Sequence, residues 1–323
     1  MIRAYLIDEQ GETRKLDSLP ALKDVNVPGA QRIWIDVEEP APDELAALAA
    51  WFPLDAEALD DCVQGEQRPR VDEFDTHIFL VLYGAGDFEK DEEFTPHKIG
   101  IFFSERFVIT VHAEPMTSIR SLRERCEKHA DFMLNRGMDF LLYSVIDHVV
   151  DRYALMIDAL EDKVELLEDQ ALAHDARASV LETLSDIKRD MIHLRRVIMS
   201  QREVIEPFVT GEYDYIAEAL ASRFLHVRDH LTKNLELVEG LRDLLQGVRD
   251  NYNATLANRL NAIMKTLTLF ATLLMPLTFL TSVYGMNVGL PFQDDPIAFW
   301  VIAFGMVCLT VAMTVYFWFK KWI

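Results

Sequence analysis

The residues whose side chains could most clearly take part in chemistry form a polar stripe within an apolar C-terminal segment. They recur at intervals of three and four residues, which places them on one face of a helix: Asn261, Met264, Thr268, Ala271, Met275, Thr278 and Ser282. Uncharged hydroxyl, amide and thioether groups are what a water-filled path for hydrated cations would need. Small residues at this spacing also allow close packing of membrane helices, and the spacing alone favours packing over a cation path.

A pair of histidines offers a second kind of chemistry. His226 and His230 are four residues apart and share a helix face, with Asp229 next to it. Such a pair can bind Zn²⁺, Co²⁺ or Ni²⁺. No third ligand is close in sequence, so two solvated histidines on a long polar helix are the simpler interpretation.

The polar stripe lies in one of two long runs that contain no Asp, Glu, Lys or Arg. Residues 266–293 and 296–319 are each longer than the roughly 20 apolar residues that cross a bilayer, so they predict two membrane-spanning helices. We expect a long stalk helix over 211–285 that starts near Glu212 and continues through Pro276 into the first span, because neighbours can satisfy a carbonyl freed by proline in a membrane. The second span is expected over 297–319, after a loop at 286–296.

The flanking charges predict the orientation of these spans. Lys265 precedes the first span, Lys320 and Lys321 follow the second, and the connecting loop has no basic residue. The positive-inside rule therefore places both termini in the cytoplasm, with 320–323 as a short basic tail. The N-terminus lacks the uninterrupted apolar region of a signal peptide, so the large N-terminal part is expected to stay inside the cell.

The sequence patterns of the N-terminal part predict an α+β cytoplasmic domain over residues 1–115, with a mixed sheet and flanking helices. Alternating or buried β-rich runs predict strands at 32–37, 77–83, 98–103 and 107–112, and helical patterns occur at 43–51 and 55–62. Apolar residues at helical spacing then predict cytoplasmic helices over 116–210. Breaks are expected near 135–137, around Asp175 and at 207–211.

Composition excludes several classes of function. The chain carries 53 acidic and 32 basic residues, a net charge of −21, which repels nucleic acid phosphates and attracts cations. The three cysteines, Cys62, Cys126 and Cys308, imply no disulfide framework. No P-loop, HExxH, GxSxG or Cys/His cluster is present, so neither an enzyme nor transport driven by ATP is indicated.

One motif directs these observations to a known family. Tyr284-Gly285-Met286-Asn287 follows the first of two C-terminal spans and resembles the signature of the CorA family of divalent-cation channels. Further segments resemble that family at the same spacing, namely 275–279 (Met-Pro-Leu-Thr-Phe), 261–265 (Asn-Ala-Ile-Met-Lys), 319–322 (Phe-Lys-Lys-Trp) and 33–36 (Ile-Trp-Ile-Asp).

The resemblance implies a funnel-shaped homopentamer in which five first spans line a pore. Gly285, Met286 and Asn287 would form the selectivity filter, with a ring of Asn287 amides at the outer mouth. Mg²⁺ loses its water reluctantly, so neutral acceptors can hold it through its hydration shell. Asn287 could instead cap the helix or turn the loop. The usual Met-Pro-Glu-Leu loop is absent, and Asp294 with Asp295 would supply the negative potential at the mouth.

The resemblance also implies closure by metal ions bound between cytoplasmic domains. The acidic loop containing Asp87, Glu89 and Asp91 is a candidate half of such a site, although a solvated acidic loop is the simpler interpretation. On the long helix, His226 stands where the family often has aspartate.

Together these features predict a two-pass inner-membrane protein that carries Mg²⁺, and also Co²⁺ or Ni²⁺, inward along its electrochemical gradient. The expected partners are copies of the same chain, the bilayer and divalent cations, which serve as transported and regulatory ions, with no tightly bound cofactor and no nucleic acid. A zinc-preferring transporter of the same superfamily and a non-conducting membrane-anchored helical scaffold or sensor are the alternatives.

Overall fold

The computed structural model describes residues 1–8, 12–23, 30–65, 67–85, 95–173, 179–286, 288–289, 296–320 and 322. The chain forms two compact units. The first comprises Met1–Gln170 and Ala178–Arg249, and the second comprises Ala171–Arg177 and Asp250–Ile323.

The first unit contains a seven-stranded sheet in the order β2-β1-β3-β7-β6-β5-β4. The strands are β1 (Ile2–Ile7), β2 (Thr13–Leu16), β3 (Arg32–Glu38), β4 (Arg70–Glu73), β5 (Ile78–Ala85), β6 (Pro96–Phe103) and β7 (Phe107–His112). The central pair β3 and β7 is parallel, whereas all other neighbours are antiparallel. The prediction of a mixed sheet is therefore confirmed.

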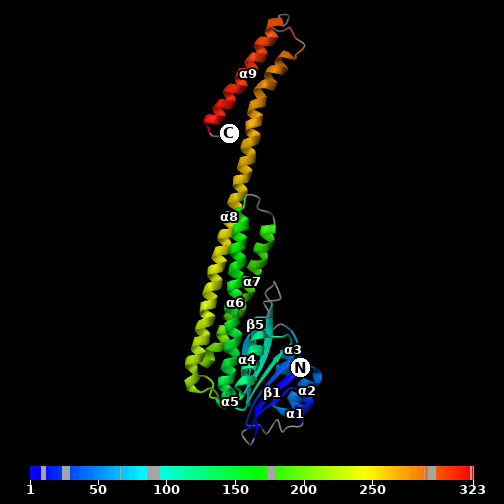
Figure 1. Cartoon of the computed structure of the whole chain (residues 1–323), viewed down its shortest axis with the longest axis vertical. Coiled ribbons are helices and arrows are strands. Elements are labelled where there is room, and N and C mark those ends of the chain that lie inside the picture. Colours follow the sequence, from blue (N-terminus) through cyan, green and yellow to red (C-terminus); the bar gives the residue numbers. More distant parts are fainter. Residues whose placement is uncertain are drawn as a thin grey trace. The chain divides into compact units, whose positions relative to one another are not determined.

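Three short helices cover one face of this sheet, α1 (Leu19–Lys23), α2 (Pro42–Trp51) and α3 (Ala56–Val63) (Figure 1). Alternate strand residues such as Ile33, Ile35 and Ile109 point into a buried apolar core with Leu48 of α2 and Leu59 of α3. Asp55 fixes the start of α3, because its carboxylate accepts a hydrogen bond of 3.0 Å from the amide of Ala58.

The opposite face carries the helices α4 (Thr117–Lys128), α5 (Ala130–Asn135), α6 (Met138–Leu172) and α7 (Ser179–Thr210) (Figure 1). Two polar side chains fasten the long helices to the sheet. The Tyr153 hydroxyl of α6 and the Gln201 amide of α7 both donate to the carbonyl of Tyr83 in β5, and Gln201 also donates to the Tyr153 hydroxyl at 2.8 Å. These hydrogen bonds join α6 and α7 to the strand β5.

The helix α8 (Glu218–Tyr284) is 67 residues long, and its first part belongs to the first unit and its last part to the second. It continues through Pro276, as predicted, but it begins at Glu218 rather than near Glu212. The break before it lies at residues 211–217, later in the chain than the expected 207–211. α7 runs through Pro207 to Thr210 and ends because Gly211 adopts a left-handed φ of 74°.

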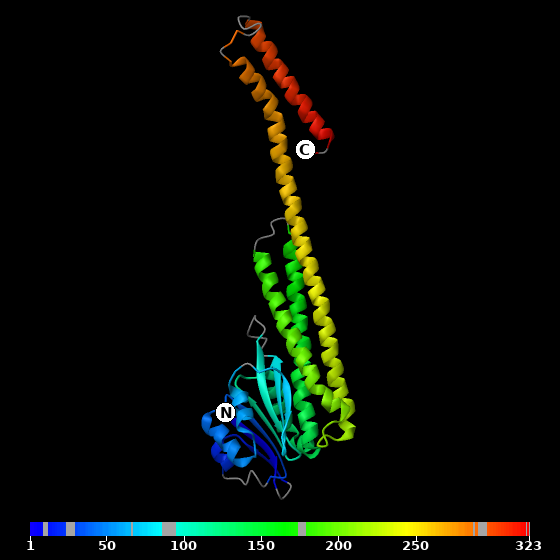
Figure 2. The ribbon, with the colours of Figure 1, turned by 180° about the vertical axis from the view of Figure 1, so that it is seen from behind.

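The second unit contains the rest of α8 and the helix α9 (Pro296–Phe319). Figure 2 shows α9 running back beside the C-terminal part of α8 as a hairpin. By length and apolar composition, α8 and residues Phe299–Phe319 are the helices of the described chain that can cross a membrane. Both predicted spans are therefore helical and long enough for this role.

Three strands were not predicted from the sequence. β2 (Thr-Arg-Lys-Leu) and β4 (Arg-Val-Asp-Glu) are only four residues long and are rich in charge, which is typical of edge strands that must not pair with other chains. β1 lies at the N-terminus and pairs with both β2 and β3.

Candidate functional site

The polar stripe predicted on the long helix lies on an open face of α8. All seven of its residues, from Asn261 to Ser282, are exposed in the single chain, and the side chains of Met264 and Met275 are 64% and 76% exposed. The stripe therefore makes no packing contacts within the chain that would bury it.

A different face of the same segment is partly shielded. Its members again follow helical spacing, and they are Leu269, Thr272, Leu273, Pro276, Leu277, Leu280 and Val283. A matching stripe on α9 is also partly shielded and consists of Ile302, Ala303, Met306, Leu309, Thr310, Met313 and Phe317. The predicted polar stripe thus occupies a face of α8 other than the one that packs within the hairpin.

Hydroxyl groups of α8 use their protons on the helix backbone. The Thr278 hydroxyl donates to the Leu274 carbonyl at 2.9 Å, and the Thr272 hydroxyl donates to the Thr268 carbonyl at 2.8 Å. A hydroxyl oxygen with its proton committed in this way still accepts hydrogen bonds. On the exposed stripe, Thr278 can therefore accept from the water around a hydrated cation.

The helix α8 ends at Tyr284 and is followed by the first two residues of the predicted filter, Gly285 and Met286. The Gly285 amide donates to the Thr281 carbonyl at 2.9 Å, and a Cβ at position 285 would lie 3.1 Å from that same oxygen. A larger residue there would crowd the last turn. Met286 is exposed beyond it, whereas Asn287 lies outside the described residues. The acidic positions Asp87, Glu89 and Asp91, and Asp294 with Asp295, also lie outside them.

The histidine pair lies in the first unit, and its members have different surroundings. Nδ1 of His230 is 3.4 Å from a carboxylate oxygen of Asp151 on α6, and both side chains are about half exposed. Asp229 instead contacts the guanidinium of Arg228 at 3.4 Å. His226 is exposed on the same helix face as His230. The structure therefore brings an acidic residue to His230 from a distant part of the sequence.

A second acidic residue of α6 lies one turn before Asp151. Burial and the nearby charge of Asp151 raise the pKa of the Asp147 carboxyl above its ordinary value. A carboxylate that is costly to charge beside another carboxylate is stabilised by a cation. Asp151 and His230 thus bring a carboxylate and an imidazole together, with Asp147 one turn away on α6. This contact could not be found from the sequence, because no spacing rule connects α6 to α8.

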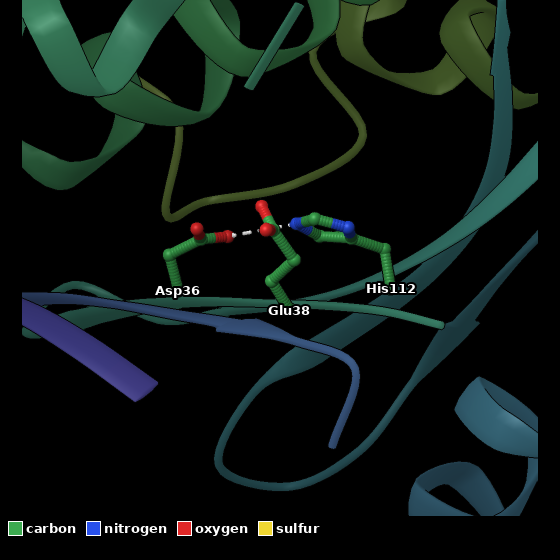
Figure 3. Close-up of side chains that lie close together, drawn as sticks. All are labelled: Asp36, Glu38 and His112. Carbon is green, nitrogen blue, oxygen red and sulfur yellow. Dashed lines mark hydrogen bonds and ion pairs between the residues drawn. The ribbon is translucent and has the colours of Figure 1, made fainter. Parts of the chain in front are cut away.

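The most deeply buried ionic group lies at the carboxyl end of the parallel strands β3 and β7. Figure 3 shows the side chains of Asp36, Glu38 and His112 converging there. One Asp36 oxygen accepts from the Thr110 hydroxyl at 2.6 Å and is 3.3 Å from Nε2 of His112. Asp36 and His112 are fully buried.

Arg123 of α4 neutralises both acids of this group. Its guanidinium donates to the second oxygen of Asp36 at 2.7 Å and lies 3.0 Å from a carboxylate oxygen of Glu38. The Nδ1 atom of His112 lies 2.6 Å from the Glu114 carbonyl. Every polar atom named here has a partner, which buried ionic groups require.

These contacts shift the pKa values of the group in opposite senses. Burial raises the pKa of the Asp36 carboxyl, but hydrogen bonding and charge from His112 and Arg123 outweigh burial and hold it below its ordinary value. Burial lowers the pKa of the His112 imidazole, but the hydrogen bond and charge of Asp36 outweigh burial and raise it. Both residues are therefore held in their charged forms.

Asp36, Glu38 and His112 could in principle hold a metal ion, since their ligand atoms lie within 4.8 Å of one another. Arg123 already supplies the positive charge between the two carboxylates, so an ion would have to displace a buried guanidinium. We therefore interpret the group as a structural lock between α4 and the sheet. A charged Asp within the apolar run Ile33-Trp-Ile-Asp36 is the sequence signal that could have indicated it.

The chain shows clear similarity to known proteins. The profile of the family described as CorA-like Mg²⁺ transporter protein matches residues 29–321. The chain is 31% identical to YfjQ of Bacillus subtilis, over 96% of both chains. It is 28% identical to the cobalt/magnesium transport protein CorA of Thermotoga maritima, over 99% of this chain and 91% of the relative.

Solved structures show the same fold. The structure of the CorA magnesium transporter from Methanocaldococcus jannaschii covers 100% of this chain and 99% of its own, with a TM-score of 0.89 at 22% identity. The full-length CmaX protein covers 99% of this chain and 96% of its own, with a TM-score of 0.74 at 21% identity.

The α+β unit, the long helix α8 and the apolar hairpin define a membrane-embedded class of protein with two candidate spans. The chain belongs to the family of CorA-like Mg²⁺ transporters. The resemblance stated from the sequence is confirmed, whereas the role of each site residue stays a prediction.

The buried lock gives a direct test of stability. We expect Arg123→Met to lower the free energy of unfolding by about 3–5 kcal/mol, because it removes the guanidinium between Asp36 and Glu38 and leaves the second oxygen of Asp36 without an ionic partner in the core. The exposed Arg125 on the same helix serves as a matched control, and Arg125→Met should change stability by less than about 0.5 kcal/mol. Denaturant unfolding of the full chain measures both. Equal effects of the two substitutions would contradict the lock.

Proposed function

We propose that the protein transports Mg²⁺, and also Co²⁺ or Ni²⁺, across a membrane, with the polar stripe of α8 lining the ion path. The observation that supports this most directly is the exposure of an uncharged polar face on a helix long enough to span a bilayer. Membership in the CorA-like Mg²⁺ transporter family supports the same substrate class.

Two spans in one chain cannot enclose an aqueous path. An exposed polar face on a membrane helix must therefore be covered by copies of itself around an axis, because lipid would leave its hydroxyl and amide groups unsatisfied. A homopentamer is the arrangement that the family resemblance implies. In it, each α8 would present Thr268, Met275 and Thr278 to the axis and Leu273 to α9.

The filter would select hydrated ions at the outer mouth. Ordered neutral acceptors bind the water shell of Mg²⁺ without replacing it, and a ring of Asn287 amides would supply such acceptors. Gly285 lets the last turn of α8 close tightly just before this ring. Entry would be inward, since a membrane potential contributes about 2.3 kcal/mol per charge per 100 mV and roughly double for a divalent ion.

Regulation would use cations bound to the acidic first unit, with both termini in the cytoplasm. Asp147, Asp151 and His230 form one candidate site, because Asp151 and His230 approach within 3.4 Å and Asp147 lies one turn away. His226 and Asp229 are the remaining candidates on α8. The loop with Asp87, Glu89 and Asp91 is a further candidate, and binding to either site would reduce repulsion among chains of charge −21.

The Asn287 ring is tested by removing its amides. We expect Asn287→Ala to abolish Mg²⁺ uptake into proteoliposomes while the oligomer forms normally, because the change removes acceptors and adds no bulk. Light scattering of the purified protein checks assembly. Normal Mg²⁺ flux in this variant would exclude the selectivity role.

The position of the ion path is tested at Met275. We expect Met275→Leu to conduct like the wild type, and Met275→Asp to assemble but to change Mg²⁺ flux, since a carboxylate on the path either wets it or traps the ion. Leu273→Asp is the matched control on the shielded face. Its carboxylate should make membrane insertion less favourable by about 2.5–3.5 kcal/mol and thereby impair assembly. Poor assembly of Met275→Asp would move the path to another face of α8.

The site on α6 and α8 is tested with Co²⁺, which imidazole and carboxylate both bind. We expect Asp151→Asn and His230→Gln each to weaken Co²⁺ binding to the full chain by about tenfold or more, measured by isothermal titration. The exposed Asp158 lies on the same helix, and Asp158→Asn should leave the affinity unchanged. Equal affinities in all three variants would mean that these residues are merely solvated.

The contact between Asp151 and His230 is also relevant to the alternative of a zinc-preferring transporter. An imidazole at the candidate site favours Zn²⁺, Co²⁺ and Ni²⁺ over Mg²⁺ as the regulatory ion, whereas Tyr284 and Met286 match the magnesium type of the motif. Competition among Mg²⁺, Co²⁺, Ni²⁺ and Zn²⁺ in a proteoliposome flux assay separates the transported ion from the regulatory one. Preferential Zn²⁺ flux would favour the zinc-preferring relative.

A further inference from the structure

A basic groove lies between α7 and α8 in the first unit, far in sequence from the ion path. It has a volume of about 490 Å³, which is within the range of small-molecule sites. Its cationic lining residues come from α7, α8 and the segment before β4, and they are Arg68, Lys188, Arg195, Arg196 and Arg242. Such a concentration of positive charge is unexpected in a chain of net charge −21.

Among the residues that the structure describes, two carboxylates line the groove, and one of them is already paired. The Glu239 carboxylate accepts from Nε of Arg195 at 2.5 Å and lies 3.7 Å from the guanidinium of Arg242. The other, Glu203, lies at one end of the α7 face. The groove therefore keeps an excess of positive charge after its internal ion pairs are formed.

Three of the cations have no partner in the described part of the chain. Arg68, Lys188 and Arg196 form no ion pair or side-chain hydrogen bond with any residue that the structure describes, and all three are exposed. Long side chains that converge on one concave surface without counter-charges repel one another. An anion in the groove would remove this repulsion.

The groove also has an apolar floor. Met191 and Val238 are buried beneath it, whereas Ile192 and Met199 leave 46% and 40% of their surface exposed beside the cations. A purely inorganic anion would leave this apolar surface in water. A ligand with both an anionic and an apolar part would cover it.

We propose that this groove binds an organic polyphosphate of nucleotide size, with the phosphates among Lys188, Arg195 and Arg196 and the apolar part on Ile192 and Met199. Guanidinium groups bind phosphate oxygens in bidentate pairs, which supplies directional affinity that scattered lysines lack. The absence of a P-loop in the sequence excludes a known hydrolytic motif but not binding.

Size and charge argue against a macromolecular polyanion. A nucleic acid would place further phosphates against a surface whose net charge is −21, and the groove holds only a small molecule. Mg²⁺ on the phosphates would reduce their charge, so the groove should favour the Mg²⁺-free form. Its occupancy would then fall as Mg²⁺ rises.

The test is binding of ATP to the purified full-length protein at low ionic strength with EDTA, measured by isothermal titration. We expect saturable binding, and we expect Arg196→Gln to weaken it about tenfold, the value of one charge-assisted contact. Arg189 lies on the same helix outside the groove, where it pairs with Asp186, and Arg189→Gln should leave the affinity unchanged. No ion flux is measured, so the result is independent of the proposed transport.

Outcomes of three kinds would overturn the proposal, in binding, in specificity and in assembly. The first is the absence of saturable ATP binding at concentrations on the order of 1 mM. The second is equal binding of ATP and tripolyphosphate, which would deny a role to the apolar floor, or equal weakening by Arg196→Gln and Arg189→Gln. The third is a change in oligomer size for Lys188→Gln with Arg196→Gln and no change in ATP affinity, which would make the groove a contact between copies.

Discussion

The helix α8 must satisfy its own backbone wherever lipid surrounds it, and the architecture depends on this constraint. A carbonyl freed inside a bilayer has no water to bind, so a 67-residue helix that enters the membrane can bend but cannot open. Pro276 leaves one carbonyl without its usual amide, and threonine hydroxyls donate to neighbouring carbonyls in the same segment. The constraint explains why the polar groups of this segment are side chains on an unbroken helix and not open backbone.

The distribution of charged residues follows the same division between lipid and water. The apolar hairpin has no Asp, Glu, Lys or Arg over residues 266–293 and 296–319, so nearly all the charge lies on the water-exposed part. In the water-exposed part, the acidic residues have different surroundings. Asp36 is buried and neutralised by Arg123, whereas Asp151 is half exposed beside His230. Burial with a fixed partner gives rigidity, and exposure beside an imidazole leaves room for an exchangeable ion.

Sequence periodicity predicted the elements that bury a regular pattern, and it failed where tertiary contacts decide. The four predicted strands and the passage of α8 through Pro276 follow from apolar spacing, and the short charged strands β2 and β4 do not. Asn261 to Ser282 could be placed on one face because helical spacing is local. The proximity of Asp147 and Asp151 to His230 could not be predicted, and neither could the contact of Arg123 with Asp36. Both depend on the packing of elements that are distant in the sequence.

The parallel pairing of β3 with β7 has a consequence for the order of events during synthesis. Residues 32–38 leave the ribosome long before residues 107–112. The centre of the sheet therefore cannot close until the chain has been made as far as β7. Even then the second oxygen of Asp36 would lack its ionic partner until Arg123 emerges, although Thr110 and His112 of β7 contact the first oxygen. Completion of this buried ionic group therefore depends on the translation of α4, a helix outside the sheet.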